Sequence, residues 1–566
     1  MNVLFHGRPF CTSINPVPLY RGAHDVRTLG IKGDVDYLYD PVNDTFEALY
    51  ERIARDWQPD MIVCWTQEDC PPPIGIEHAP ILTAATITDW DLHYADLLFN
   101  LGRYDIVLCD KGGVALFSNE WASPQYHGPL FAQTSQVHKT YDEAKDIDVL
   151  FIGSLQGGRN EPRACFLERV AKLADRFRVV MHFGTYDEPY GRLMSRARIV
   201  FNHSIRGELN LRFFETLAAN ALAFLEDMNI DVRDWFEDGR DVVLYNDENL
   251  EQRLLYFLEH PEEAEKIAAR GHARAAEFAP ENRMDSLIDW LAAQPRGPRR
   301  FRELPRWQQL YHTALLFRGK FDAQHQDVQW NQLNELLQAR PDDPKVWTVL
   351  GHHHMLRLST VDKSQPRAAE FTRACLRAHQ LDPDSAPFAF NAALALSWCA
   401  PGTQAVQRLL LEIVLRTDSM VGEELVIGSY WDPFYSRWHR AMAEGRQSIA
   451  MLRAEAHIRL AMLDEGEGRY GPAEEHLHAA AAQDPGNFGG VQLLAEILWK
   501  TGRRALAIQT LCGNLPNLPL NFDARKRLVE MLEQEGFVQE ARNVLLETNR
   551  IRDVLSELEK DCPSPK

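Results

Sequence analysis

The stretch MSRARIVFNHSIRGELNLRFFETLAANALAFLED (residues 194–227) decides the fold, because it reads as a strand, a polar loop, a helix and a second strand. Arg198–Val200 is a short β-branched run, and His203–Asn210 is polar and contains a glycine. In such a unit the loop and the helix start lie at the carboxyl end of a parallel sheet, where ligands bind. Free N–H groups at a helix start favour a phosphate, arginine adds bidentate recognition, and a carboxylate one turn later can hold sugar hydroxyls. A surface ion pair between Arg212 and Glu215 explains the same two residues equally well.

The order R-I-V-F-N, loop, L-R-F-F-E-T-L-A-A-N-A-L and then D-x-x-x-W-F-E-D-G-R-D-V-V-L-Y resembles the donor half of GT-B glycosyltransferases. It is most similar to the bacterial group-1 branch that includes the CgeB-like (spore maturation) proteins, well over residues 146–292 and loosely over residues 1–145. The resemblance implies that Glu215, which opens E-T-L-A, binds the ribose of a nucleotide donor. The family pattern has another glutamate eight residues earlier, where this chain has Gly207, with Glu208 one residue out of register. This departure leaves the role of a second glutamate, and retention or inversion at the sugar, open.

Length and composition limit the class of protein. A chain of 566 residues is too long for one core and indicates three or four domains. The formal charge of −20 argues against a nucleic-acid binder, although a local positive pocket for a nucleotide sugar remains compatible with it. None of the nine cysteines forms a C-x-x-C pair, so we expect reduced thiols and a cytoplasmic protein. The start of the chain lacks the features of a signal peptide, and with no long apolar run we expect no membrane span.

Strands alternate with helices through residues 1–145 and again through residues 146–295. This alternation predicts βαβ units and two parallel sheets. We therefore predict two Rossmann-like domains, an acceptor-side domain and a donor domain, which is the GT-B arrangement in the family that the chain resembles. The expected strands are Val3–Phe5, Met61–Trp65, Ile81–Ala85, Ile106–Cys109, Asp148–Ile152, Arg178–Phe183, Arg198–Val200 and Ala223–Leu225.

A linker and a helical repeat region follow the second domain. Residues 296–307 contain several arginines and prolines, and we expect a solvated hinge there. Beyond it, glycine, alanine and leucine recur every 34 residues, with glycine between two helices and alanine where the helices touch. This period is the signature of tetratricopeptide repeats, so residues 308–566 are predicted to form a helical solenoid with a concave binding face. The recurring sets are Gly468, Gly502 and Gly536, then Ala473, Ala507 and Ala541, then Leu477, Leu511 and Leu545.

The donor-binding candidates lie on the loops after the strands of the second domain. The glycine-rich loop 153–159 follows a strand and precedes a helix, so it can approach a diphosphate closely, although a tight turn with a surface arginine is the plainer interpretation. The resemblance favours Arg163 over Arg159 as the phosphate-binding arginine. For Asn202, local backbone bonding is an equally good explanation. The predicted set is Gly153, Ser154, Arg159, Arg163, Gly184, Asn202, Asn210, Leu211, Arg212 and Glu215.

The catalytic base is expected on the first domain, at loops after its strands, because an inverting enzyme needs a carboxylate or histidine there. Asp91 in T-D-W-D-L-H-Y is the first candidate, and His6 in F-H-G-R-P-F is the second. Asp110 and Asp89 occupy similar positions. Each of these residues is more often a helix cap or a turn residue. The resemblance implies metal-independent transfer, in which basic groups and helix N-termini stabilise the diphosphate.

These features predict an enzyme that moves a sugar from a nucleotide donor to an acceptor. The repeats indicate a protein acceptor, such as flagellin or another surface protein, by analogy with the eukaryotic O-GlcNAc transferase, whose repeats precede its GT-B half. Three alternative interpretations stay open. In the first, the enzyme transfers the sugar to a polysaccharide or a lipid-linked acceptor. In the second the chain is a non-catalytic scaffold, and in the third it is a nucleotide-sugar epimerase.

Overall fold

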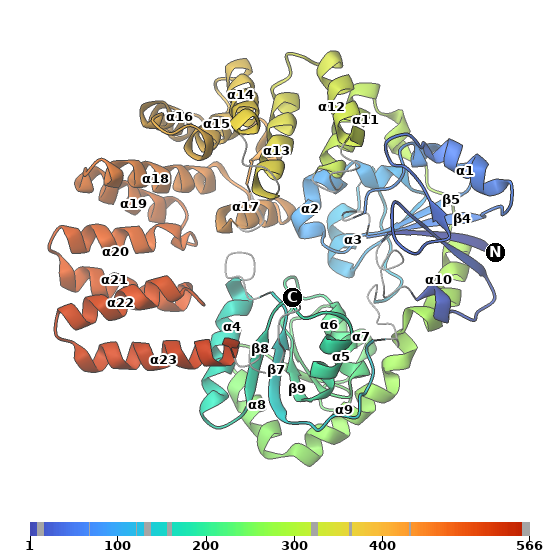
Figure 1. Cartoon of the computed structure of the whole chain (residues 1–566), viewed down its shortest axis with the longest axis horizontal. Helices are drawn as coiled ribbons and strands as arrows, with labels where there is room; N and C mark the ends of the chain where they lie inside the picture. The colour runs from blue at the N-terminus through green and yellow to red at the C-terminus, as the bar shows by residue number, and fades with distance from the viewer. Residues whose placement is uncertain are drawn as a thin grey trace.

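The computed structural model describes residues 1–7, 16–66, 68, 70–119, 121–129, 137–154, 161–318, 327–360, 365–428 and 432–556. It contains two parallel β-sheets, each with its own helices, and a long array of helices (Figure 1). Within these ranges no helix combines the length and the apolar character needed to cross a membrane.

The first sheet has six parallel strands in the order β3-β2-β1-β4-β5-β6. This doubly wound order places the switch point between β1 and β4. Alternate residues of the strands face two separate cores, with Leu4 and Ile62 on one side and Val3 and Val63 on the other, as expected for a sheet covered on both faces. The elements are β1 (Asn2–Gly7), β2 (Asp25–Gly30), β3 (Tyr37–Leu38), α1 (Phe46–Ala54), β4 (Met61–Trp65), β5 (Leu82–Thr86), α2 (Trp90–Leu97), β6 (Ile106–Leu108) and α3 (Lys111–Phe117).

The second sheet has five parallel strands in the order β11-β10-β9-β7-β8, with its switch point between β7 and β9. All the strands that the sequence predicts in both sheets are present, within two residues at their ends. The elements are β7 (Ile147–Ile152), α4 (Glu161–Ala171), β8 (Val179–His182), α5 (Asp187–Ser195), β9 (Ala197–Phe201), α6 (Leu211–Ala218), β10 (Leu222–Glu226), α7 (Val232–Trp235), β11 (Val243–Tyr245), α8 (Leu250–Glu259) and α9 (Pro261–Ala275).

Helix α10 (Pro280–Ala293) returns from the second domain to the first (Figure 1). Its Met284, Ile288 and Leu291 are buried in the core that contains Val3 of β1. The predicted donor range 146–295 therefore includes a helix that belongs to the first domain by packing.

The expected solvated hinge at residues 296–307 is wrong for Arg299. The Arg299 guanidinium is buried, and its Nε donates to Oδ1 of Asp105 at 2.9 Å while Nη1 and Nη2 donate to the carbonyls of Ala79 and Ile81 at 2.6 Å. Phe301 is fully buried close by. These contacts dock the segment on the first domain, because a buried guanidinium requires partners for its N–H groups.

A helical region follows, as the sequence predicts. Most of its helices pack as consecutive antiparallel pairs, and α17 stands between two pairs. The turns at Gly468, Gly502 and Gly536 have φ of 75°, 83° and 81°, a left-handed conformation that favours glycine. The helices are α11 (Arg306–Phe317), α12 (Asp327–Ala339), α13 (Pro344–Thr360), α14 (Gln365–Leu381), α15 (Ala386–Cys399), α16 (Gln404–Arg416), α17 (Pro433–Ala443), α18 (Ile449–Gly466), α19 (Tyr470–Gln483), α20 (Val491–Lys500), α21 (Arg504–Asn514), α22 (Phe522–Gln534) and α23 (Val538–Ser556).

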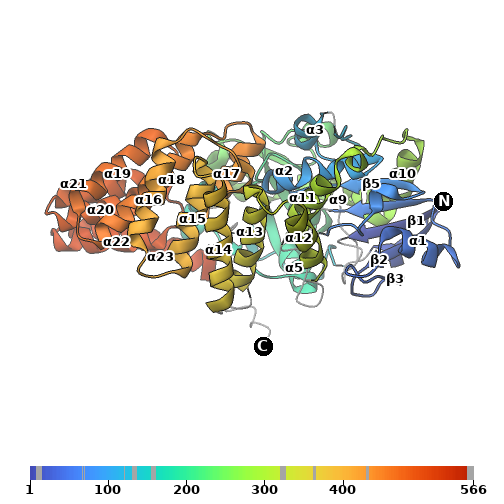
Figure 2. The same ribbon diagram turned by 90° about the horizontal axis from the view of Figure 1, so that it is seen from above.

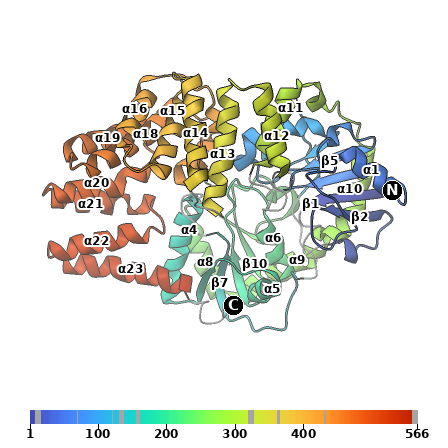
Figure 3. The same ribbon diagram turned by 45° about the horizontal axis from the view of Figure 1, so that its top comes forward.

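This helical array forms an arc between the two sheet domains (Figures 1 and 3). At its start α11 packs against α2 of the first domain, and α17, near the middle of the array, packs against the same helix. At its end, Ile551 and Val554 of α23 enter the core of the second domain. Seen from above, the array lies beside the two sheet domains and continues away from them (Figure 2).

Candidate active site

The donor-side candidates meet at the switch point of the second sheet. Gly153 follows β7 and Asn202 follows β9, and these two strands are neighbours. The carboxyl ends of the strands at a switch point form the crevice in which open α/β sheets bind ligands.

Arg212, in the first turn of α6, lies across this crevice. Its Nε donates to the carbonyl of Ile152 at 2.5 Å, and its Nη1 donates to Oδ1 of Asn202 at 2.7 Å. Its Cζ lies 4.5 Å from the centroid of the Phe151 ring. A Cβ on Gly153 would lie 2.0 Å from Nη2 of Arg212, so the glycine makes room for the guanidinium.

Arg163 of α4 lies close to the same ring, with its Cζ 5.9 Å from the centroid of Phe151. Its Nε donates to the carbonyl of His203 at 2.8 Å. Burial, together with the charge of Arg212, lowers the pKa of Arg163 to about 9, and burial also lowers the pKa of Arg212. Among the described residues both arginines bond only to neutral oxygens, and neither forms an ion pair. Two buried guanidinium groups without a carboxylate in ion-pair contact are chemically suited to an anion, and the carboxyls of Glu208 and Glu226 lie near enough to act on both electrostatically.

Two asparagines fix the loop between β9 and α6. Asn210 caps α6 by accepting from the N–H of Phe213 at 3.2 Å. Its amide also exchanges two hydrogen bonds with the amide of Asn202, at 3.0 and 3.1 Å. Because Oδ1 of Asn202 also accepts from Arg212, both asparagines position the arginine.

Glu215 lies one turn beyond Arg212, and its carboxylate faces protein groups. One oxygen accepts a hydrogen bond from the hydroxyl of Tyr190, and the other lies 3.5 Å from Nε2 of His138. Because each carboxylate oxygen can accept two hydrogen bonds, these contacts do not exclude a ribose hydroxyl, and the ribose-binding role of Glu215 stays a prediction.

The other predicted donor residues differ in setting. The Ser154 Oγ is buried and has no hydrogen-bond partner in the described part of the chain. Gly184 has a φ of 88°, and a Cβ at this position would meet nothing within 4 Å, while Leu211 is 44% exposed at the start of α6. Arg159 lies outside the described residues.

The sequence interpretation did not include Glu226 among the site residues. It ends β10, and its Oε1 accepts from the N–H of Ser204 at 3.1 Å and from the Ser204 hydroxyl. Burial raises the pKa of Glu226 to about 7, and the pKa of the nearby Glu208 is also raised by burial. Its position at the carboxyl end of a strand was the signal available in the sequence.

Arg206 joins the two domains at the site and was also missed. It extends from the loop after β9, its side chain is 8% exposed, and its Nη1 lies 2.7 Å from Oδ1 of Asp91 and its Nη2 3.4 Å from Oδ2 of Asp110. Its Cζ lies 4.9 Å from the ring of Trp90. Asp91, the first candidate for the base, is therefore a buried ion-pair partner in this arrangement.

His6, the second candidate, ends up at the switch point of the first sheet. Its Nε2 lies 3.1 Å from the hydroxyl of Tyr39, and burial lowers the pKa of His6 to about 4. The imidazole is therefore neutral near pH 7, the form that a general base requires. Within the described ranges, no contact joins His6 to the loops of the second domain.

Metal-ligating side chains are dispersed in the part of the chain that the structure describes. The described residues contain no group of three or more His, Cys, Asp or Glu side chains arranged to hold a metal ion. The expectation of metal-independent transfer stays a prediction.

Comparisons with known proteins assign the second domain to a family. Residues 139–289 match the protein family described as "Glycosyl transferase-like". No curated protein matches the sequence. Among solved structures, TarM is 9% identical over 41% of this chain and 55% of its own, with a TM-score of 0.31. A glycosyltransferase from Rickettsia africae ESF-5 is 10% identical over 52% of this chain and 99% of its own, with a TM-score of 0.35. Anabaena HepE in complex with UDP-glucose is 11% identical over 52% of this chain and 100% of its own, with a TM-score of 0.39.

The family match characterises the second domain of the chain. Residues 139–289 form a glycosyltransferase-like domain. The two sheet domains of the chain meet at loops that follow their strands, through Arg206 and Asp91. The matched region spans just over half the length of TarM.

Proposed function

We propose that the protein transfers a sugar from a nucleotide-sugar donor to a protein acceptor, in the manner of GT-B enzymes and without a metal ion. The observation that carries this proposal is the pair of buried guanidinium groups of Arg163 and Arg212, which have only neutral partners among the described residues. A nucleoside diphosphate supplies the charge that this pair lacks. As the bond to the sugar breaks, negative charge grows on the leaving diphosphate, and the arginines stabilise it without reorganising.

The acceptor oxygen needs a base from the first domain. Asp91 and His6 remain the candidates for this base, and they differ in what must change before each can accept a proton. Oδ1 of Asp91 pairs with Arg206 and its Oδ2 lies 3.9 Å from Nε of Arg440, so proton uptake by Asp91 would weaken these ion pairs, whereas His6 is already neutral. A pH–rate profile of the Asp91→Asn and His6→Gln variants separates them.

The finer parts of the proposal concern the branch and the array. The resemblance to CgeB-like motifs supports assigning the donor domain to the group-1 branch, and the period of 34 residues supports tetratricopeptide repeats, whose surfaces commonly bind peptides. We therefore favour a protein acceptor, such as flagellin or another surface protein, in a cytoplasmic reaction. A polysaccharide or lipid-linked acceptor, or a non-catalytic scaffold, are the alternatives that the experiment must exclude.

A thermal-shift screen of the full chain against UDP, GDP, dTDP, CMP and their common sugars tests donor binding. A ligand that binds only the folded state raises the melting temperature, so we expect a shift with one nucleotide. Arg212→Gln should remove this shift, and Glu215→Ala should weaken donor binding by about 1–3 kcal/mol. Transfer should persist in the presence of a chelator.

Arg176→Gln serves as the control, because Arg176 is an exposed arginine of the same domain that pairs with Glu259. It should keep the full shift. Absence of a shift with every nucleotide would favour the scaffold, and an unchanged shift in Arg212→Gln would contradict the proposed diphosphate site.

A further inference from the structure

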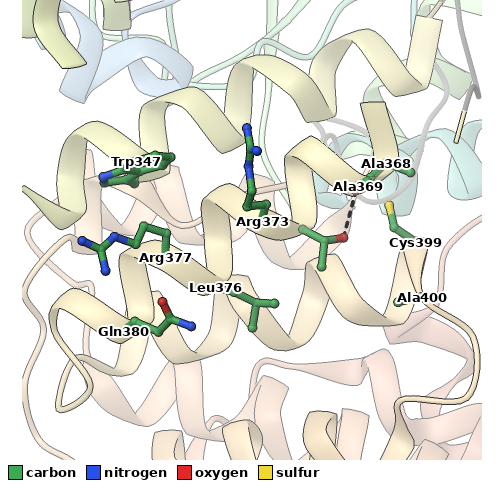
Figure 4. Close-up of a pocket in the computed structure, with 10 residues that line it drawn as sticks. Trp347, Ala368, Ala369, Arg373, Leu376, Arg377, Gln380, Cys399 and Ala400 are labelled. Atoms are coloured by element: carbon green, nitrogen blue, oxygen red, sulfur yellow. Dashed lines mark hydrogen bonds between the residues drawn. The ribbon is translucent and has the colours of Figure 1, made fainter. Parts of the chain in front are cut away.

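A groove of about 860 Å³ lies on the helical array, away from the site described above (Figure 4). The exposed face of α14 forms its floor, and α13 and the end of α15 contribute to its walls. Trp347, Arg377 and Gln380 lie toward one end in this view, Cys399 and Ala400 lie at the other, and Arg373 is between them (Figure 4).

The groove of this acidic protein is lined by basic but not acidic side chains among the described residues, and the carboxylates that pair with its arginines lie outside the lining. Among the described residues that line it, two are arginines and none is aspartate or glutamate, whereas the whole chain carries a formal charge of −20. Arg373 and Arg377 are four residues apart on α14, so both project from the same face of the helix.

Both arginines are available to a ligand at little cost. Arg373 pairs with Glu370 on its own helix, and its side chain is 68% exposed. Arg377 pairs with Asp342 at 3.1 Å, and that carboxylate is 79% exposed. Exposed pairs of this kind contribute little to stability, so a carboxylate of the ligand can replace Glu370 or Asp342.

The remaining lining suits a peptide. The indole N–H of Trp347 already donates to the carbonyl of Pro341 at 2.7 Å, which leaves the ring as an apolar wall. The side-chain amide of Gln380 has no hydrogen bond within the described ranges and can bond to a peptide backbone. Leu376, Thr372, Cys399 and three alanines complete the lining.

Length and spacing define the peptide. The lining residues of α14 run from Ala368 to Gln380, which is about 18 Å along a helix axis. An extended chain advances about 3.3 Å per residue, so the groove accommodates about five residues. The two arginines are about 6 Å apart along the axis, close to the spacing of residues i and i+2 of a strand, which face the same side.

We propose that this groove binds an extended acidic peptide segment of the acceptor protein, with two carboxylates at positions i and i+2 paired to Arg373 and Arg377. The assignment of the segment to the acceptor rests on the proposed function. The preference of the groove for an acidic peptide does not, and it can be measured without donor or transfer.

Fluorescence anisotropy with labelled peptides and the full chain tests the proposal. The probe is Gly-Ser-Asp-Ser-Asp-Ser-Gly, and its partner has asparagine at both acidic positions. We expect the acidic probe to bind about tenfold more tightly than the asparagine peptide, and to lose this advantage in Arg373→Glu/Arg377→Glu. A lysine-containing version of the peptide should bind the double variant better than it binds the native chain.

Arg416→Glu is the matched control, because Arg416 is an exposed arginine of α16 that does not line the groove. It should leave binding of the acidic probe unchanged. Equal binding of the acidic and asparagine peptides, or full binding by the double variant, would overturn the proposal. The nucleotide thermal shift of the double variant should equal that of the native chain, so failure of the groove and failure of the donor site give different results.

Discussion

At Gly153, the absence of a side chain leaves space for the guanidinium group of Arg212. Its backbone follows β7, and a Cβ at this position would meet Nη2 of Arg212 at 2.0 Å. We expect Gly153→Ala to displace the guanidinium from the carbonyl of Ile152 and from Asn202, and so to weaken nucleotide binding about tenfold, measured by isothermal titration calorimetry.

Gly239→Ala is the control for that substitution. Gly239 has a φ of 75° in the same domain and has nothing within 4 Å of a Cβ, so alanine brings backbone strain without a clash. Equal losses of affinity in the two variants would show that Gly153 does not act through Arg212.

We expect the free energy of unfolding to depend on pH through the buried carboxyl group of Glu226. The pKa of its carboxyl rises from 4.5 to about 7 in the folded state because the group is buried. Between these pH values the folded state binds more protons than the unfolded state, so the free energy of unfolding falls as the pH rises, by on the order of 3 kcal/mol in total. Glu226→Gln cannot ionise, and we expect it to remove this part of the slope in urea unfolding between pH 4.5 and 8.

Part of the slope should remain in that variant. Burial also raises the pKa of Asp231, to about 6, and of Glu208, so both carboxyls contribute in the same direction. Glu248→Gln, on an exposed residue, should follow the native curve. If Glu226→Gln also followed the native curve, Glu226 would not be the titrating group.

At the residue scale, the sequence predicted contacts between residues close together in the chain better than contacts between distant residues. The strand–loop–helix pattern identified Arg212, Asn202 and Asn210, and the structure brings them into contact. Arg206 and Glu226 were missed for different reasons. The partner of Arg206 is Asp91, 115 residues earlier, and no local pattern encodes such a pair. Glu226 resembles any strand-terminal carboxylate until its burial is known.

At the scale of elements, hydrophobic runs located the buried strands and the period of 34 residues located the helix pairs. Strands β2, β3 and β11 were not predicted. The first residues of β2 are polar or half-buried and its last three are buried, while β3 and β11 have two and three residues. The segment 296–307 was misread for a related reason. Its composition is that of a linker, but Arg299 finds Asp105 and two carbonyls only when the first domain has folded.

At the scale of the whole molecule, the array is more than an attached module. It holds the first domain through Arg318, whose Nη2 donates to Asp96 at 3.0 Å, and it supplies Ile551 and Val554 to the second domain. A fragment without the array would expose both surfaces. Point substitutions therefore test the role of the array more cleanly than deletion of residues 308–566, in which lost folding and lost acceptor binding would look alike.

The ion pair Glu168–Arg525 allows the contribution of the contact between the array and the second domain to stability to be measured. The two residues lie on α4 and α22, their charged atoms are 2.9 Å apart, and both side chains are almost fully buried. Removing Glu168 leaves the buried Arg525 with the longer contact to Glu547 at 3.4 Å, so we expect Glu168→Gln to lower the free energy of unfolding by up to about 3 kcal/mol. The pair Arg527–Glu496 lies on neighbouring helices within the array and is partly exposed, and Glu496→Gln should cost less than about 1 kcal/mol. Hydrogen exchange locates the effect, because loss of the bridge should speed exchange in both α23 and β8. Equal costs for the two substitutions, or faster exchange in the array alone, would mean that the array rests on the second domain without stabilising it.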